Sequence, residues 1–252
     1  MQRLVLCALL CISSIVTAAE PPLVAVASNL TQVVTEIAGR FETRTGITVK
    51  LSFGSSGNFA RQILQGAPFQ LFLSADKKYL DMLKDEGRQL VRITELARGR
   101  IGFFIPSDST LSGITDLDSI VNALEFGNYR RLVIANPDLA PYGLAARQAL
   151  ESAGVWIVDQ EKLVLGENIA QAVQFSISGA VDIGIIPESS TLLPEVYNKG
   201  RYISIPETWH QPIQQYLALL SDVNPSAIRF YDYLMTQESR EILLEYGYAP
   251  TP

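Results

Sequence analysis

The sequence predicts an α/β protein with two lobes, each built on a mixed, mostly parallel sheet flanked by helices. Short apolar strands alternate with amphipathic helices, and the links between them are short, which is typical of parallel sheets. The alternation pauses after an apolar strand from Arg100 to Ile105 and starts again at Leu132. A length of 252 residues, 48% of them hydrophobic, suits one large globular domain or two small ones, and the two α/β units favour two lobes.

Residues 1–19 are predicted to form a secretory signal peptide. A short basic start precedes an almost wholly apolar run from Leu4 to Val16, and the small residues after it suit cleavage. The run is too short to span a bilayer, and Leu10 before Cys11 disfavours a lipoprotein. Because Cys7 and Cys11 both fall in this peptide, the exported chain has no cysteine, which excludes disulfides and thiol chemistry.

The first lobe is predicted to begin with a buried strand from Leu23 to Ser28. Asn29 then caps a helix that Gly46 ends, with apolar residues at helical spacing: Leu30, Val33, Val34, Ile37 and Phe41. A second strand, Ile47 to Phe53, alternates apolar and polar residues and is expected to be half-buried. A third strand from Gln70 to Ser74 leads into a helix that runs through Leu83.

The turn Gly54-Ser55-Ser56-Gly57 follows the second strand and opens a helix that carries Phe59, Ala60, Ile63 and Leu64 on one face. A helix N-terminus exposes unpaired N–H groups, and two hydroxyls lie beside them here, so the turn is suited to hold an anion. Taken alone, it is explained equally well as a flexible loop with a capping serine. It has no lysine and no Walker pattern, which disfavours a nucleotide-binding loop.

The second lobe is predicted to repeat this pattern. Its strands are expected at Leu132–Ala135, Leu163–Leu165, Val181–Ile186 and Tyr202–Ile205. The turn Asn136–Gly143 follows the first of these strands and opens a helix, while Asn168 precedes a second helix whose apolar face starts at Ile169. Asp182 is expected to be a buried structural carboxylate. The chain then returns with a strand at Tyr216–Leu220 and ends in two helices.

Four of the predicted turns share one design. Each lies between a strand and a helix and carries neutral hydrogen-bonding groups: Ser28-Asn29, Ser55-Ser56, Tyr142-Gly143 and Asn168-Ile169. Ligands of open α/β sheets bind outside the carboxyl ends of the strands, where such turns lie. Each turn alone is more often a structural cap. Four together, two in each lobe of an exported protein, predict a cleft that holds an anion with neutral donors.

Charge and reactive residues argue against other classes of function. The formal net charge is −6, which disfavours nucleic-acid binding and requires that an anion be held by local dipoles. His210 is the single histidine, so a zinc site is disfavoured. A secreted serine hydrolase would have to pair Ser55 or Ser56 with His210. It stays a remote alternative, because the sequence has no G-x-S-x-G elbow and no evident orienting carboxylate.

These residues resemble a known family, the periplasmic molybdate-binding proteins, which are the solute-binding components of molybdate ABC transporters. The resemblance runs from about Leu23 to the end of the chain. The segments that carry it, in order, are Ala25–Leu30, Ser52–Gly57, Gly66–Pro68 with Leu71–Asp76, Ile134–Pro137 with Ala140–Gly143, and Phe230–Leu234. It implies a type II periplasmic-binding-protein fold with the ligand in the cleft. Residues 20–101 and 216–252 would form lobe 1, and residues 102–215 would form lobe 2.

The resemblance also implies which residues bind the ligand. Lobe 1 would supply Ser28, Asn29 and Ser56, and lobe 2 the main-chain N–H groups of Tyr142 and Ile169. Many relatives add a tyrosine hydroxyl just after the strand that here ends at Pro187, so that bond is missing or replaced. The protein would be a periplasmic monomer without a catalytic residue, a cofactor or direct ligands for a metal cation. It would hand molybdate to the membrane permease of an ABC transporter.

The chemistry of the ligand agrees with this assignment. Molybdate and sulfate are fully deprotonated dianions at neutral pH and need donors only, whereas phosphate keeps a proton and calls for an acceptor. None of the four turns has an aspartate at its centre, and Glu167, beside Asn168, is expected to face solvent. Tungstate is nearly the same size as molybdate and is expected to bind too. A carrier for sulfate or another tetrahedral oxyanion stays the alternative, because no sequence count gives the size of the cavity.

Overall fold

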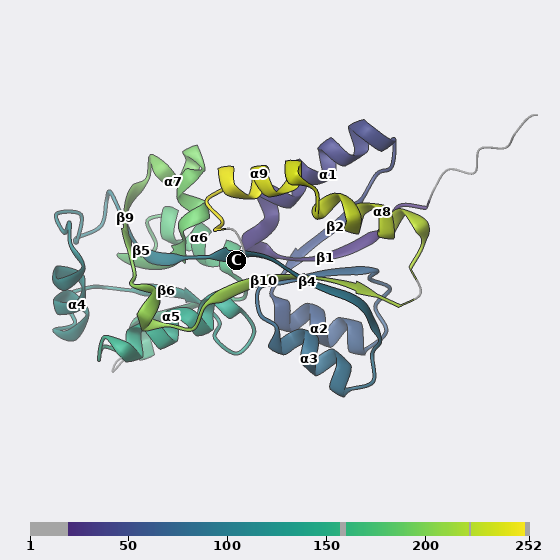
Figure 1. Cartoon of the computed structure of the whole chain (residues 1–252). Helices are drawn as coiled ribbons and strands as arrows, with labels where there is room; N and C mark the ends of the chain where they lie inside the picture. Colours follow the sequence, from purple (N-terminus) through teal and green to yellow (C-terminus); the bar gives the residue numbers. More distant parts are fainter. Residues whose placement is uncertain (1–19, 157–159, 222, 250–252) are drawn as a thin grey trace, which may run out of the picture.

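The computed structural model describes residues 20–156, 160–221 and 223–249, which form two lobes that each contain a five-stranded sheet (Figure 1). We call the sheet that contains the first strand, together with its helices, the first lobe, and the other sheet with its helices the second lobe. The predicted signal peptide, residues 1–19, lies outside the described residues. Across the described ranges, no helix is both long and apolar enough to cross a membrane.

The first sheet has the strand order β2-β1-β3-β10-β4. β1 pairs in parallel with β2 and β3, whereas β10 runs antiparallel to both β3 and β4, so the sheet is mixed with one opposed strand. The strands are β1 (Leu23–Ala27), β2 (Lys50–Gly54), β3 (Leu71–Ser74), β4 (Leu90–Gly99) and β10 (Ile213–Leu220).

Helices cover both faces of this sheet because its central strands are apolar on both sides. Val24 and Val26 pack into the core under α1, α8 and α9, while Ala25 between them packs into the core over α2 and α3 (Figure 1). The helices are η1 (Ser28–Leu30), α1 (Thr31–Thr45), α2 (Ser56–Leu64), α3 (Lys78–Asp85), α8 (Pro225–Leu234) and α9 (Gln237–Glu245).

The second sheet repeats this topology with the strand order β7-β6-β8-β5-β9. β6 pairs in parallel with β7 and β8, and β5 runs antiparallel to β8 and β9. The prediction of two mixed, mostly parallel sheets is therefore confirmed. The strands are β5 (Ile101–Pro106), β6 (Leu132–Ala135), β7 (Leu163–Gly166), β8 (Ile183–Pro187) and β9 (Gly200–Ser204).

The second sheet is also covered on both faces. Phe103 and Ile105 of β5 pack into the core that includes α4 and α5, and Phe104 between them packs against Val173 of α6 and Val196 of α7. The helices are α4 (Leu117–Glu125), α5 (Pro141–Ser152), η2 (Gln160–Lys162), α6 (Ile169–Ile177), η3 (Glu188–Leu192), α7 (Pro194–Tyr197) and η4 (Glu207–Trp209).

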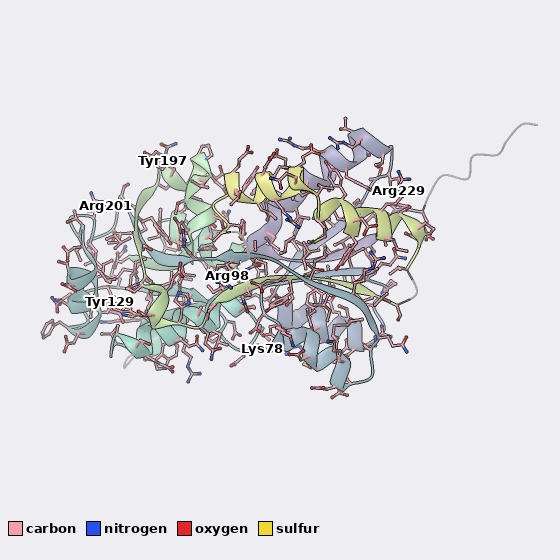
Figure 2. All side chains as sticks on the ribbon, in the orientation of Figure 1. Lys78, Arg98, Tyr129, Tyr197, Arg201 and Arg229 are labelled. Carbon is pink, nitrogen blue, oxygen red and sulfur yellow. The ribbon has the colours of Figure 1, made fainter. Side chains whose placement is uncertain are left out.

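The chain passes between the sheets at two places. Only Arg100 separates β4 from β5, and Arg98 lies at the junction of the two lobes (Figure 2). The return passes from β9 through η4 to β10. The C-terminal segment also reaches this junction, because Ala249 forms an antiparallel bridge with Arg98. The lobe boundaries at 101/102 and 215/216 stay predictions.

Three sequence predictions differ from the structure. The strand β4 and the helix α4 had no counterpart in the prediction. The second strand begins at Lys50 and lies at the edge of its sheet, so Phe53 keeps 40% of its surface exposed and does not join a buried face. The helix α5 begins at Pro141, which places Tyr142 and Gly143 in its first turn and not in the preceding loop. Proline is well suited to that first position.

Candidate functional site

Three helices of the two lobes begin with an N–H group that has no partner. These groups belong to Ser56, the first residue of α2, Tyr142, the second residue of α5, and Ile169, the first residue of α6. In the described part of the chain none of the three donates a hydrogen bond, as expected for the first turn of a helix. The positive end of each helix dipole lies at the N-terminus of that helix, beside its unpaired N–H group.

Hydrogen bonds between the lobes bring these helix ends together. The N–H of Gly57 donates to the carbonyl of Leu139 at 2.9 Å, which joins the start of α2 to the turn before α5. The N–H of Ala170 donates to the hydroxyl of Ser28 at 3.4 Å, which joins the start of α6 to the end of β1. The structure is therefore closed: across the cleft between the lobes, the segment after β2 contacts the turn after β6, and the segment after β1 contacts the start of the helix after β7.

Two serine hydroxyls lie in this cleft and are nearly or fully buried. Ser28 accepts from Ala170 as described, and the hydroxyl of Ser56 accepts the N–H of Ala75 at 3.1 Å. Each of these bonds uses a lone pair of the oxygen and leaves the hydroxyl proton for another acceptor. Ser55, next to Ser56, has a different role, because its hydroxyl caps α2 by accepting the N–H of Asn58 at 3.4 Å.

Asn29 does not cap the first long helix, so that prediction is wrong. η1 intervenes, α1 begins at Thr31, and no side chain caps either helix. The amide nitrogen of Asn29 instead donates to Gln215 Oε1 at 2.9 Å and to the hydroxyl of Tyr248 at 3.2 Å. Both partners are buried polar groups in the junction between the lobes. Hydrogen bonds to them take the place of the helix cap that asparagine favours locally.

The cleft is electrically neutral apart from its rim. None of Ser28, Asn29, Ser56, Tyr142 and Ile169 has an ionisable side chain except Tyr142, and burial raises the pKa of that phenol well above its usual value. Glu167 is exposed, as expected, and its carboxylate accepts from Asn58 Nδ2 at 3.1 Å across the mouth of the cleft. In the described residues no cluster of three His, Cys, Asp or Glu side chains could hold a metal cation.

A pocket of about 210 Å³ continues from Ser28, Asn29 and Ile169 along the second lobe. Sequence reasoning missed its further polar lining, which comes from Thr31, Gln32, Gln174, Ser189 and Ser190, with Glu195 as its one carboxylate. The serines belong to η3, directly after Pro187. Turn-forming serines after a strand were the signal available, but nothing local in the sequence shows that they face the first lobe.

A phenol does lie beside the position where the family resemblance led us to expect a tyrosine. It belongs to Tyr248, whose hydroxyl accepts from Ser189 Oγ at 3.4 Å and donates to the carbonyl of Asn29 at 2.7 Å. Burial raises the pKa of Tyr248 to about 12, although hydrogen bonds with Ser189 and Asn29 oppose the increase, so it adds no charge at neutral pH.

In the described residues, the groups that a serine hydrolase would pair are not joined to one another. His210 Nδ1 lies 2.8 Å from the carbonyl of Gln211, and the hydroxyls of Ser55 and Ser56 accept from main-chain N–H groups. Within the described ranges, no hydrogen bond joins His210 to either serine.

A fold of two α/β lobes with unpaired N–H donors at facing helix ends is typical of solute-binding proteins. Residues 22–249 match the family model of the bacterial extracellular solute-binding proteins, and the chain belongs to this family. This match confirms the resemblance inferred from the sequence at the level of the family. Two relatives named as molybdate-binding proteins agree with the more specific resemblance.

The molybdate-binding protein ModA of Azotobacter vinelandii is 36% identical to this chain over 235 residues, which cover 90% of the chain and 88% of the relative. ModA of Rhodobacter capsulatus is 32% identical over 234 residues, covering 92% and 89%. The structure of the A. vinelandii periplasmic molybdate-binding protein superposes with a TM-score of 0.83 at 27% identity, covering 92% of this chain and 100% of that one.

Proposed function

We propose that this protein binds molybdate in the periplasm and delivers it to the membrane permease of an ABC transporter. The observation that carries the proposal is the set of unpaired N–H groups at Ser56, Tyr142 and Ile169, which begin helices of both lobes beside the hydrogen bonds that join the lobes. Relatives named as molybdate-binding proteins, at 36% and 32% identity, support the choice of ligand.

The donors match a fully deprotonated tetrahedral oxyanion. Three N–H groups and the hydroxyl protons of Ser28 and Ser56 can each donate to one oxygen, and a hydrogen bond to a charged group contributes roughly 1.5–3 kcal/mol. Five such bonds offset the cost of taking a dianion out of water without any lysine or arginine. Phosphate, which keeps a proton at neutral pH, would place that proton against groups that also donate.

A ligand held by donors from both lobes would also favour the closed arrangement. Ser56 lies in the first lobe, and Tyr142 and Ile169 lie in the second, so an anion bound to all three bridges the cleft. A ligand that contacts both lobes stabilises the closed state relative to the open one. In this proposal the closed protein, a monomer, is the form that the permease recognises.

Calorimetric titration of the purified protein tests the proposal. Molybdate and tungstate are expected to bind, and a concentration of 100 times Kd raises the free energy of unfolding by about 2.7 kcal/mol. Sulfate in thousandfold excess is expected not to displace molybdate, and phosphate is expected to give no heat. Absence of heat and of thermal stabilisation with both molybdate and tungstate would refute the proposal. Displacement by sulfate would reassign the protein as a carrier of sulfate or a related oxyanion.

A further inference from the structure

A cluster of buried polar side chains lies in the junction of the lobes, beside the candidate site. Asn29 is its centre, and its amide nitrogen donates to Gln215 of β10 and to Tyr248 of the C-terminal segment. The hydroxyl of Tyr142 lies 3.4 Å from the same nitrogen. Gln215 is 0% exposed and Tyr248 is 2% exposed, whereas Asn29 is half-buried and also lines the 210 Å³ pocket. Its members are separated by up to 219 residues in the sequence.

The hydroxyl of Tyr248 makes three hydrogen bonds in this cluster. It donates to the carbonyl of Asn29 at 2.7 Å and accepts from the amide nitrogen of Asn29 and from Ser189 Oγ. A phenol has one proton to donate and can accept two bonds, so no further bond is available to it. Tyr248 therefore contacts Asn29 at both its main chain and its side chain, and fixes the residue on two sides.

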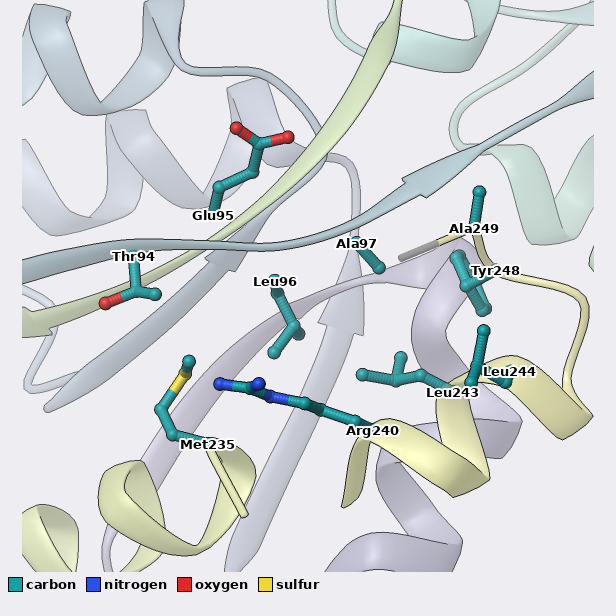
Figure 3. A pocket seen from close by; sticks show the side chains of 10 residues that line it. All are labelled: Thr94, Glu95, Leu96, Ala97, Met235, Arg240, Leu243, Leu244, Tyr248 and Ala249. Carbon is teal, nitrogen blue, oxygen red and sulfur yellow. The ribbon is translucent and has the colours of Figure 1, made fainter. Parts of the chain in front are cut away.

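One of these bonds joins the two lobes. Ser189 belongs to η3 of the second lobe, whereas Asn29 belongs to the first. Gly247, just before Tyr248, also faces the second lobe, because a side chain there would lie 3.2 Å from Leu192. Figure 3 shows Tyr248 and Ala249 close to β4 of the first lobe, where Tyr248 lines a pocket of about 190 Å³ together with Leu96, Ala97 and Leu243.

The amide nitrogen of Asn29 is committed to partners within the protein. Its nitrogen has two protons, and the bonds to Gln215 and to the two tyrosine hydroxyls use both. The side chain thus acts as a support for the turn Ser28-Asn29, and the group this turn offers to an anion is on its main chain and on Ser28. Hydrogen bonds from this nitrogen to several buried partners restrict the orientation of the side chain.

We propose that Tyr248 is a positioning residue that holds Asn29 at the anion and ties it to the second lobe through Ser189 in the closed state. The inference rests on the proposed oxyanion-binding function and adds a residue that does not touch the anion. It explains how the C-terminal segment, remote in sequence from all four turns, contributes to binding.

Stopped-flow and calorimetric measurements with molybdate on purified variants test this inference. Tyr248→Phe removes only the hydroxyl, and the dissociation rate is expected to rise about 5- to 10-fold, because its three hydrogen bonds are lost, including the one from Ser189 that joins the lobes in the closed state. Ser189→Ala is expected to raise it about 2- to 5-fold. The double variant is expected to match Tyr248→Phe alone, because the bond from Ser189 ends on the hydroxyl already removed.

Tyr246→Phe is the matched control. It makes the same change two residues earlier, where the hydroxyl donates to Glu36 Oε2 at 2.9 Å on α1, and molybdate dissociation is expected to be unchanged. An unaltered dissociation rate in Tyr248→Phe, or additive effects in the double variant, would overturn the inference. If Tyr248→Phe does not fold, an unaltered rate in Ser189→Ala overturns it instead.

The outcome for the wild-type protein separates this inference from the proposed function. If the wild-type protein does not bind molybdate, both the proposed function and the role of Tyr248 are refuted. If the wild-type protein binds molybdate and molybdate dissociates from Tyr248→Phe at the same rate, only the role of Tyr248 is refuted.

Discussion

The main-chain N–H of Gly57 donates to the carbonyl of Leu139 across the cleft, at a point where no side chain fits. A β-carbon on Gly57 would lie 2.8 Å from the Leu139 oxygen and 3.1 Å from the hydroxyl of Tyr79. Gly57 has ordinary helical geometry, so its backbone does not require glycine. The close approach of the second lobe is what requires it.

Gly57→Ala is therefore expected to impair closure and not folding. The steric overlap with Leu139 would cost about 1–3 kcal/mol in the closed state, which weakens molybdate binding roughly 10- to 100-fold. Without ligand, the free energy of unfolding should stay within about 1 kcal/mol of wild type, because the helix preference of alanine and mild crowding by Tyr79 oppose each other. Calorimetry and urea unfolding measure the two effects.

Gly39→Ala provides the control, because a β-carbon there meets nothing within 4 Å in the middle of α1. It should raise stability by up to about 1 kcal/mol and leave the affinity for molybdate unchanged. Equal affinities of the Gly57 and Gly39 variants would mean that the closed contact with Leu139 does not take part in binding.

Ser56→Ala should lower mainly the affinity for molybdate, whereas Ser55→Ala should lower mainly the stability of the fold. Ser56→Ala removes a proposed anion donor and also leaves the N–H of Ala75 without its acceptor, so affinity should fall at least tenfold and stability by about 1 kcal/mol. Ser55→Ala removes the cap of α2, so stability should fall by about 1 kcal/mol with a change in Kd below about threefold. Similar losses of affinity in both variants would count against the assignment of Ser56.

The buried carboxylate of Asp182 should govern acid stability. It accepts from the main-chain N–H of Arg130 at 2.6 Å and from the guanidinium at 2.8 and 3.0 Å, which confirms that it is a structural carboxylate. Burial disfavours its charged form, but the hydrogen bonds and charge of Arg130 outweigh burial and hold its pKa below the usual value. Its stabilisation is thus complete above about pH 4 and is lost as the pH falls through the lower folded-state pKa.

Asp182→Asn should lower the free energy of unfolding by about 3 kcal/mol at pH 7. This value is at the low end of the cost of breaking a buried ion pair, because the side chain of Arg130 is exposed. The difference from wild type should shrink as the pH approaches 3. Asp232→Asn, which breaks a surface pair with Arg92, should cost less than about 1 kcal/mol. Urea unfolding across pH 3–7 gives both values, and a pH-independent deficit in Asp182→Asn would contradict this assignment.

Tyr79 has a buried hydroxyl that finds no hydrogen-bond partner in the described residues. Burial, together with the charge of Asp76, raises its pKa to about 12. Because an unpaired buried hydroxyl is unfavourable, Tyr79→Phe should increase the free energy of unfolding by up to about 1 kcal/mol. Tyr231→Phe, which removes a 2.6 Å contact with Thr94 Oγ1, should decrease it. A loss of stability in Tyr79→Phe comparable to that in Tyr231→Phe would show that the hydroxyl is paired.

Local patterns in the sequence were sufficient for most of the fold. The strand Leu132–Ala135 has the predicted bounds, and Asn168 caps the helix that begins at Ile169, because apolar runs and helix caps depend on neighbouring residues. The strand β4 was missed since Arg92 and Glu95 interrupt its apolar alternation and a bulge shifts its register against β10. Its stability comes from pairing with a strand more than 100 residues away.

The candidate site was predictable only in its parts. The four turns could be located, but which of their groups remain unpaired depends on contacts between the lobes. Asn29 illustrates the limit, because after a strand it has the local features of a helix cap, and its partners Gln215 and Tyr248 are 186 and 219 residues away. The assignment of the ligand-binding residues stays a prediction that the proposed variants test.

The single residue between β4 and β5 has a consequence for how the protein would open. Arg100 pairs with Glu207 at 2.8 Å and with Glu188 at 3.7 Å, and its carbonyl accepts the N–H of Glu188, so it is anchored on the side of the second lobe. Rotation between the lobes would then centre on Gly99, where a side chain would overlap the hydroxyl of Tyr142. The charged contacts of Arg100 would travel unbroken with the second lobe, and release of the anion would require no separation of opposite charges at the pivot.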